Sequence, residues 1–380
     1  MKRTLTAVKL AIVAGAVAGV WSGTASAGPG RVGPAGGFVY VADCGYPCDG
    51  NQPGSVLGYA IDGATGALTP VAGSPFAAGT GSQAVAVDPT GRFVYVTNLG
   101  SNDVSGYTID GAGTLTAIAG SPFQAGAAPW SVAVDPSGQF VYVANTHSNT
   151  VSAYTIDRTT GALVAITGSP FASGSTPISV TVDHTGQFVY VADLILDRIE
   201  GYVITRTGGL MPLCGSPFPA ETNPFSLAVD PTGRFAYATN DGSNNVSAYA
   251  VDGATGVLTP VADSPFAAGK DPRSVTVDPT GQFVYVANAL SDGLSAYVIE
   301  GKGALREVDG SPFSTGSAPN SVAVERTGQF AYVANTSGGV SAYRIDGATG
   351  ALMELAGSPF AAGPVPIAVT TTAGPAPPAQ

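Results

Sequence analysis

The chain has little charge and few of the residues that favour long helices. Only 11% of its 380 residues are Asp, Glu, Lys or Arg, whereas 44% are hydrophobic. Lys and Glu, which are good helix formers, are scarce, while Gly, Pro, Val, Thr and Tyr are plentiful. This composition argues against a helical protein and predicts an all-β, turn-rich fold with a large core.

Residues with obvious catalytic chemistry are also few. The chain has two histidines and three cysteines, and it has no Gly-x-Ser-x-Gly elbow, no P-loop and no paired-His metal motif. Its net charge of −11 makes nucleic acid and anionic lipid poor partners. We therefore expect no cofactor, no metal and no nucleic-acid partner.

Residues 1–27 have the pattern of a secretory signal. Lys2, Arg3 and Lys9 form a positive region, Leu10 to Trp21 is a short apolar run, and Ala25-Ser26-Ala27 is a small-residue cleavage site. The apolar run is short for a membrane anchor, and no later run is long enough to span. We expect export to the periplasm, the cell surface or the medium. Cleavage removes three positive charges and changes the net charge of the chain from −11 to −14.

Internal repeats are the main signal in the remaining sequence. The segment FVYVAD at 38–43 recurs in closely similar form six more times, and Ser-Pro-Phe also occurs seven times. The repeats are 47 or 48 residues apart, except that 55 residues separate the first two. Their shared tyrosines are Tyr40, Tyr95, Tyr142, Tyr190, Tyr237, Tyr285 and Tyr332.

Each repeat offers four short strands. In the third repeat, three of them span residues 131–135, 140–145 and 151–157, and the fourth begins at Ala162. The turn Asp135-Pro136-Ser137-Gly138 joins the first two, with Asp accepting local hydrogen bonds and Gly ending the turn. Four strands repeated seven times predict a seven-bladed β-propeller over residues 28–372. Residues 373–380 are a Pro/Ala-rich tail.

The first repeat lacks its opening strand. Its chain runs from Gly33 through Gly37 directly into Phe38, whereas an unmatched strand-like segment stands at 366–370. We expect this C-terminal strand to be the inner strand of the first blade, 38–73, so that both ends of the chain close the ring.

Tyr95-Val96-Thr97-Asn98 carries a family resemblance. The chain resembles the YVTN-type β-propeller proteins, which are similar to the lactonase-like propellers that include 6-phosphogluconolactonases and carboxymuconate cyclases. The resemblance covers nearly all of the chain after residue 27 and implies the fold. Enzymes of that family work with Arg, His and Glu side chains around the channel, and no such motif can be carried over residue by residue.

Function is best sought where the repeats differ. The position just before each inner strand is expected to ring the mouth of the central channel, and its residues vary completely. One arc is apolar and the other polar, which suits an amphipathic ligand such as a sugar ring on Trp130 with an acid group at Arg273. The ring residues are Val365, Gln83, Trp130, Ile178, Phe225, Arg273 and Asn320.

Other candidates lie in loops. His147 lies in a loop on the mouth side and could reach a ligand, although a solvated side chain is the simpler interpretation. Cys44 and Cys48 lie in the insertion of the first repeat, where we favour a disulfide over free thiols or a metal. Cys214 is expected to be a small buried hydrophobe. The oxygen-rich loops 98–103 and 240–244 could bind calcium, but turn chemistry explains them.

Three functions fit this sequence. The first is an exported, non-catalytic propeller that binds a small molecule, a glycan or a protein at its mouth. The alternative is a lactonase-type hydrolase or isomerase acting on an unphosphorylated lactone or sugar acid. The third is an architectural surface protein.

Overall fold

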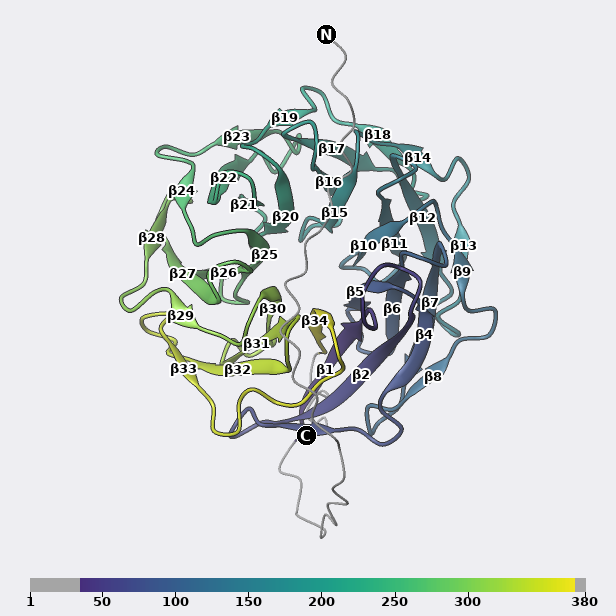
Figure 1. Ribbon diagram of the computed structural model, residues 1–380. Helices are drawn as coiled ribbons and strands as arrows, with labels where there is room; N and C mark the ends of the chain where they lie inside the picture. Colours follow the sequence, from purple (N-terminus) through teal and green to yellow (C-terminus); the bar gives the residue numbers. More distant parts are fainter. Residues whose placement is uncertain (1–34, 373–380) are drawn as a thin grey trace, which may run out of the picture. The chain divides into compact units, whose positions relative to one another are not determined.

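The computed structural model describes residues 35–372, and these residues form strands, turns and bends without a helix. The expected signal at 1–27 and the tail at 373–380 lie outside the described residues. Seven sheets surround a central axis as the blades of a propeller, which confirms the predicted fold class (Figure 1). The part of the chain described here holds no helix with the length and apolar character needed to cross a membrane.

Each blade has four main antiparallel strands, and six blades have a short fifth. The inner strands of blades 1 to 7 are β34 (Pro366–Thr371), β5 (Ser82–Val87), β10 (Pro129–Val134), β15 (Pro177–Val182), β20 (Pro224–Val229), β25 (Pro272–Val277) and β30 (Pro319–Val324). The second strands are β1 (Ala35–Asp43), β6 (Phe93–Asn98), β11 (Phe140–Asn145), β16 (Phe188–Asp193), β21 (Phe235–Asn240), β26 (Phe283–Asn288) and β31 (Phe330–Asn335). The second strands are buried between neighbouring blades, and apart from a terminal Asn or Asp they are mainly apolar.

The outer half of each blade is more exposed. The third strands are β2 (Pro53–Asp62), β7 (Asp103–Ile109), β12 (Thr150–Ile156), β17 (Arg198–Ile204), β22 (Asn245–Val251), β27 (Gly293–Ile299) and β32 (Val340–Ile345). The outer strands are β3 (Leu68–Pro70), β8 (Leu115–Ala117), β13 (Leu163–Ala165), β18 (Leu210–Pro212), β23 (Leu258–Pro260), β28 (Leu305–Glu307) and β33 (Leu352–Glu354). The fifth strands, each starting at the Phe of Ser-Pro-Phe, are β4 (Phe76–Thr80), β9 (Phe123–Gln124), β14 (Phe171–Ala172), β19 (Phe218–Pro219), β24 (Phe266–Ala267) and β29 (Phe313–Ser314).

The turn between the inner and second strands is held by its first residue. Asp135 Oδ1 accepts hydrogen bonds from the Gln139 and Phe140 amides at 2.7 and 2.6 Å, and Gly138 has a φ of 65°. This confirms the turn chemistry expected from the sequence. The expectation for Cys214 is wrong, because its side chain is exposed while the adjacent Leu213 takes the buried position.

Buried tyrosines join each blade to the next. The hydroxyl of Tyr142 in blade 3 donates to the Gly208 carbonyl of blade 4 at 2.9 Å, and Tyr95 bonds Gly161 in the same way at 2.8 Å. Burial raises the pKa of both tyrosines, so the hydroxyl stays protonated and remains a donor. The remaining five shared tyrosines, Tyr40, Tyr190, Tyr237, Tyr285 and Tyr332, make the equivalent bond.

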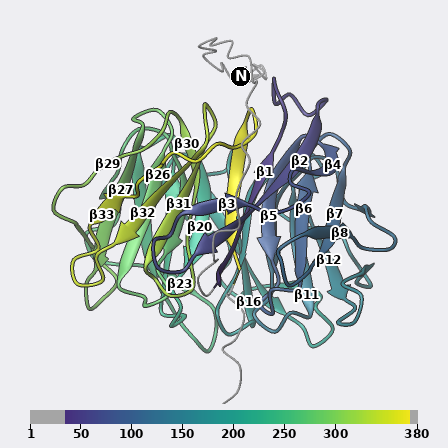
Figure 2. The same ribbon diagram turned by 90° about the horizontal axis from the view of Figure 1, so that it is seen from below.

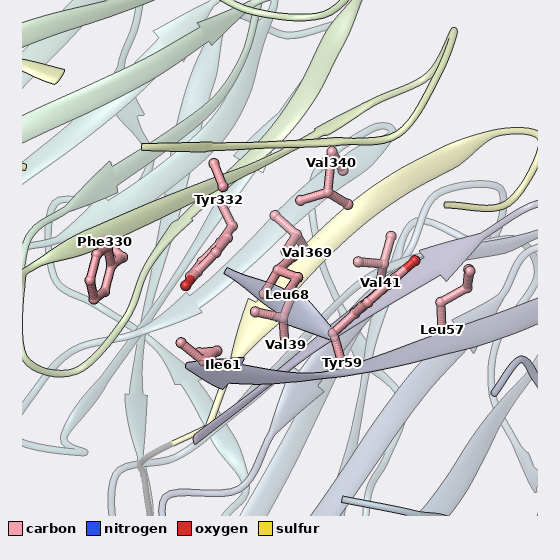
Figure 3. Packing of buried hydrophobic residues seen from close by; sticks show 12 residues of the cluster. Val39, Val41, Leu57, Tyr59, Ile61, Leu68, Phe330, Tyr332, Val340 and Val369 are labelled. Carbon is pink, nitrogen blue, oxygen red and sulfur yellow. The ribbon is translucent and has the colours of Figure 1, made fainter. Parts of the chain in front are cut away.

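The ring is closed as predicted by strands from both ends of the chain. β34 pairs antiparallel with β1, and the two run side by side in Figure 2. Blade 7 contacts blade 1 through a buried cluster that includes Tyr332, Val39 and Val369 (Figure 3), and Tyr332 donates to the Gly66 carbonyl at 2.9 Å. The first and last blades therefore make the same contact as any other pair.

Deleting residues 364–380 should greatly lower the melting temperature. The truncated chain loses β34, so blade 1 has no inner strand and the buried cluster of the closure is exposed. Deleting only residues 373–380 is the matched control, because every closure contact described above remains. Similar melting curves for the two deletions would contradict closure by β34.

Tyr142→Phe should reduce the free energy of unfolding by about 1 to 2 kcal/mol, since the Gly208 carbonyl then stays buried without its donor. Tyr46→Phe is the control, because Tyr46 is 61% exposed. Urea unfolding followed by far-ultraviolet circular dichroism measures the free energy of unfolding of both variants. Equal stability of the two variants would show that the hydroxyl bond between blades contributes nothing.

Candidate functional site at the mouth of the propeller

One face of the propeller carries two sets of loops. The loops between second and third strands contact the linkers that lead into the inner strands: the Thr146 amide donates to Ala128 O at 2.9 Å, and the Asp241 amide donates to Asn223 O at 3.0 Å. We call this surface the mouth face. It displays the positions at which the seven repeats differ most.

The variable ring position is the second residue of each inner strand, and one of its members needs correction. Val369 of β34 pairs with Val41 of β1, just as Val132 pairs with Val143 in blade 3. In this register the residue equivalent to Trp130 is Ile367 and not Val365. Val365 precedes the strand; its amide donates to Asp43 and its carbonyl accepts from Cys44. Pro364 and Pro366 both resemble the proline that starts other inner strands, so the residue types alone do not fix the register.

Three ring residues from consecutive blades form an apolar arc. Trp130, Ile178 and Phe225 pack together, with Leu194 from the loop after β16 against them. The Trp130 and Phe225 rings meet edge to face with centroids 6.4 Å apart. Such a contact favours a fixed aromatic surface over mobile side chains. The structure thus brings these predicted residues into one cluster.

A charged cluster adjoins the arc at Phe225. The Arg273 guanidinium lies over the Phe225 ring, 4.5 Å from its centroid. Asp271 accepts from Arg273 Nε at 2.6 Å and from Nη2 at 2.9 Å, and a carboxylate oxygen of Asp241 lies 3.9 Å from Nη2. Arg273 was expected to face an acid group of a ligand, and it is already paired with an acid of the protein.

Asp241 is the most perturbed carboxyl of this cluster. Its side chain is only 15% exposed. Removal from water raises the pKa of Asp241 to about 6; Arg273 opposes this shift and Asp271 adds to it. A carboxylate with a pKa near neutrality, beside a guanidinium and close to the surface, has the properties of a general base.

Comparison of the repeats contained a signal for both acids. Asp241 follows the last residue of β21, and the equivalent residues elsewhere are Leu99, Thr146, Leu194, Ala289, Thr336 and Cys44. Asp271 precedes Pro272, where neighbouring repeats have Ala128, Thr176, Asn223 and Ala318. Acids therefore occur at these two positions where no other repeat has one, but only the fold places them beside Arg273.

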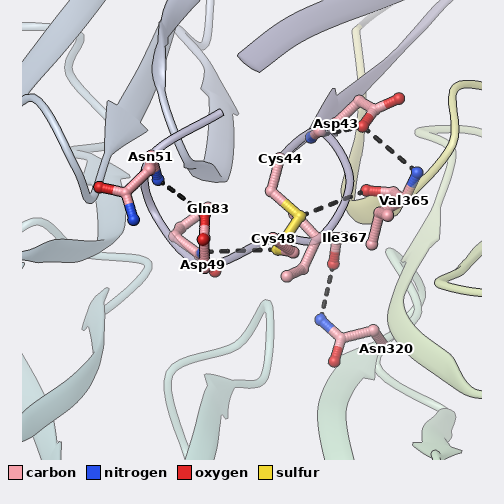
Figure 4. Close-up of a disulfide and its surroundings, with 10 residues drawn as sticks. Asp43, Cys44, Cys48, Asp49, Asn51, Gln83, Asn320, Val365 and Ile367 are labelled. Atoms are coloured by element: carbon pink, nitrogen blue, oxygen red, sulfur yellow. Dashed lines mark hydrogen bonds between the residues drawn. A yellow bond between two sulfur atoms is a disulfide. The ribbon is translucent and has the colours of Figure 1, made fainter. Parts of the chain in front are cut away.

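The insertion of the first repeat covers part of the mouth face. Cys44 and Cys48 are joined by a disulfide with Cα atoms 5.2 Å apart. Figure 4 shows Gln83 beside this loop, where its Nε2 lies 4.0 Å from Cys48 Sγ; Asn320 donates instead to the Ile367 carbonyl at 2.7 Å. The ring thus consists of an apolar arc, the Arg273 cluster, Ile367 and the two amides Gln83 and Asn320, of which Asn320 is bound to the Ile367 carbonyl.

His147 does not join the charged cluster. Its side chain is exposed, and its backbone amide donates to Ala127 O at 3.1 Å. The side-chain oxygens of Asn102 and Asn244, in the loops considered for calcium, accept from the Ala128 and Asp271 amides of the following blade. Among residues 35–372, no three His, Cys, Asp or Glu side chains are grouped to hold a metal ion.

Comparisons with known proteins agree with this fold. The family profile described as "Lactonase, 7-bladed beta-propeller" matches residues 54–180 and 173–370. A proposed 6-phosphogluconolactonase from Bacteroides fragilis is 20% identical with a TM-score of 0.76, covering 91% of this chain and 100% of that one. A periplasmic gluconolactonase from Pseudomonas aeruginosa is 21% identical with a TM-score of 0.72, covering 89% and 100%. At these identities, the TM-scores show a shared fold alone. No curated protein matches the chain.

Alkylation should distinguish the three cysteines. Without reductant, iodoacetamide should add to Cys214 alone, because Cys214 is exposed and the other two cysteines are bonded to each other. After reduction in denaturant, all three should react, which intact-mass spectrometry counts directly. Full labelling of native, unreduced protein would rule out the disulfide, and an unreactive native Cys214 would contradict its exposure.

Proposed function

The chain belongs to the seven-bladed β-propeller lactonase family, and from that premise we propose that it hydrolyses a lactone on its mouth face. The observation that carries the proposal is the pairing of Asp241 with Arg273 beside the apolar arc. The family assignment favours this hypothesis over a non-catalytic binding protein. Both remain compatible with a ligand at the mouth, but only hydrolysis needs a basic carboxylate there.

Asp241 and Arg273 supply the two functions that ester hydrolysis requires. Above its pKa of about 6, Asp241 can accept a proton from a water molecule. Arg273 has five N–H donors, of which two are bound by Asp271, so it can also donate to a carbonyl oxygen. Asp271 fixes the guanidinium through its two hydrogen bonds and therefore acts as a positioning residue.

The proposed reaction proceeds in two balanced steps. Asp241 takes a proton from water while the water oxygen bonds to the lactone carbonyl carbon, and Arg273 stabilises the resulting oxyanion. The carbonyl then re-forms as the ring C–O bond breaks, and protonated Asp241 returns its proton to the leaving alkoxide. The product is an open-chain hydroxy acid, and Asp241 is again a carboxylate.

We also propose that the protein acts after export. The sequence of residues 1–27 supports this, and a disulfide such as Cys44–Cys48 persists in oxidising compartments. The structural neighbour from P. aeruginosa is named a periplasmic enzyme, which agrees with the proposal.

Hydrolysis of a responsive lactone should depend on ionised Asp241. We expect kcat/KM to rise with pH and to level off above about 6, because the raised pKa of Asp241 keeps it protonated below that value. Asp241→Asn should lower kcat by on the order of 10²- to 10⁴-fold. A pH-stat assay corrected for spontaneous opening measures both.

Two controls separate catalysis from folding. Because the pKa of Asp241 is raised from 3.8 in the folded state, its protonated form stabilises the fold relative to its ionised form. This contribution to stability is lost as pH rises from about 4 through about 6. Asp241→Asn should therefore keep its melting temperature at pH 8. Asp292→Asn is the matched variant, since Asp292 bonds the Ala318 amide as Asn102 and Asn244 bond theirs. If both variants keep full activity, Asp241 is not the base.

A further inference from the structure

The surface beside the charged cluster is apolar well beyond the ring. Leu194 packs on Ile178 and Phe225, and the next two residues of the same loop, Ile195 and Leu196, are 62% and 44% exposed. The equivalent loops of blades 2, 3 and 5 carry Gly100-Ser101, His147-Ser148 and Gly242-Ser243 at those two positions. Large exposed aliphatic side chains that extend a buried apolar cluster are typical of a binding surface.

The charge around Arg273 disfavours an anionic ligand. Asp271 and ionised Asp241 together outweigh the one positive charge of Arg273. Arg198, on the mouth side of blade 4, is similarly paired with Glu200 at 2.7 Å and lies 3.4 Å from Asp193. A phosphate or carboxylate brought here would meet carboxylates in a partly desolvated site, where like charges repel strongly.

Phe225 joins the two surfaces. Its ring contacts both Arg273, whose guanidinium carbon lies 4.5 Å from the ring centroid, and Trp130, whose ring centroid lies 6.4 Å away. A lactone carbonyl at Arg273 would therefore have its substituent directed across Phe225 and toward Trp130, Ile178 and Leu196. Arg273 is already bound by Asp271 and is therefore not free for an acidic substituent, whereas Trp130, Ile178 and Phe225 offer an apolar surface for an alkyl one.

We propose that the substrate is an uncharged lactone with an apolar substituent, bound along the apolar arc and Leu196. This inference rests on the proposed lactonase function and specifies its substrate class. Phosphorylated sugar lactones are then poor substrates, because Asp241 and Asp271 repel their dianion and their polar ring cannot use the arc.

A series of substrates, assayed with the protein that lacks residues 1–27, tests the proposal. γ-Butyrolactone and γ-lactones with alkyl chains of increasing length should show kcat/KM rising about fourfold for each methylene buried. Glucono-δ-lactone and 6-phosphoglucono-δ-lactone should be hydrolysed more slowly than the long-chain members. Faster hydrolysis of the phosphorylated lactone would overturn the substrate class while leaving the lactonase function in place.

Surface variants locate the substituent. Leu196→Ser introduces the residue found in blades 2, 3 and 5; it should raise KM by a larger factor for long-chain lactones than for γ-butyrolactone, which has no alkyl chain to contact Leu196. Val164→Thr is the control, because Val164 is 61% exposed on outer strand β13, where blades 1, 2 and 5 carry Thr69, Thr116 and Thr259. An equal effect of both variants, or none from Leu196→Ser, would place the substituent elsewhere.

Binding separates failure of this inference from failure of the proposed function. Calorimetry with non-hydrolysable γ-lactams of the same chain lengths measures their affinity for the apolar surface without any reaction. If no lactone is hydrolysed but lactam affinity rises with chain length, the activity is refuted and the ligand class stands. If affinity is independent of chain length, the apolar substituent is refuted whatever the activity.

Discussion

The hydrogen bond from a buried tyrosine of one blade to a glycine carbonyl of the next is the contact on which the ring depends. Tyr332 completes the series by bonding Gly66, so the last blade meets the first as any two neighbours meet. Gly66 has a φ of 76°, and a Cβ there would collide with the Phe330 ring of the adjoining blade. Gly therefore recurs because a side chain would not fit between neighbouring blades, and Tyr recurs because its hydroxyl bonds the glycine carbonyl.

This rigid ring explains why the mouth can vary. The second residue of each inner strand lies beside strands whose backbone is already paired and whose core faces are already filled. Its side chain is therefore little constrained by the fold, and Trp130, Phe225 and Arg273 can occupy equivalent positions in different blades. The candidate site is then assembled between blades: Asp241 comes from blade 5, whereas Asp271 and Arg273 come from blade 6.

The same principle governs the electrostatics of the site. Arg273 is held by Asp271 and by contact with Phe225, so its orientation does not depend on a ligand. Asp241 is too far from the guanidinium for a short hydrogen bond, and burial outweighs the attraction between them. Its carboxylate consequently remains basic near neutral pH. The proposed chemistry thus depends on a few residues that break the repeat.

The sequence by itself determined the number of blades and the four main strands of each, because these strand patterns recur seven times along the chain. It also determined the closing strand, because the first repeat lacks its opening strand and an unmatched one stands near the C-terminus. It also identified Trp130, Ile178, Phe225 and Arg273 as variable positions. Only the tertiary structure decided the register of β34, which moves Ile367 into the place expected for Val365, because two prolines offered equivalent starts. Only the tertiary structure also joined Asp241 to Arg273, since contacts between blades depend on how neighbouring sheets pack and not on spacing along the chain.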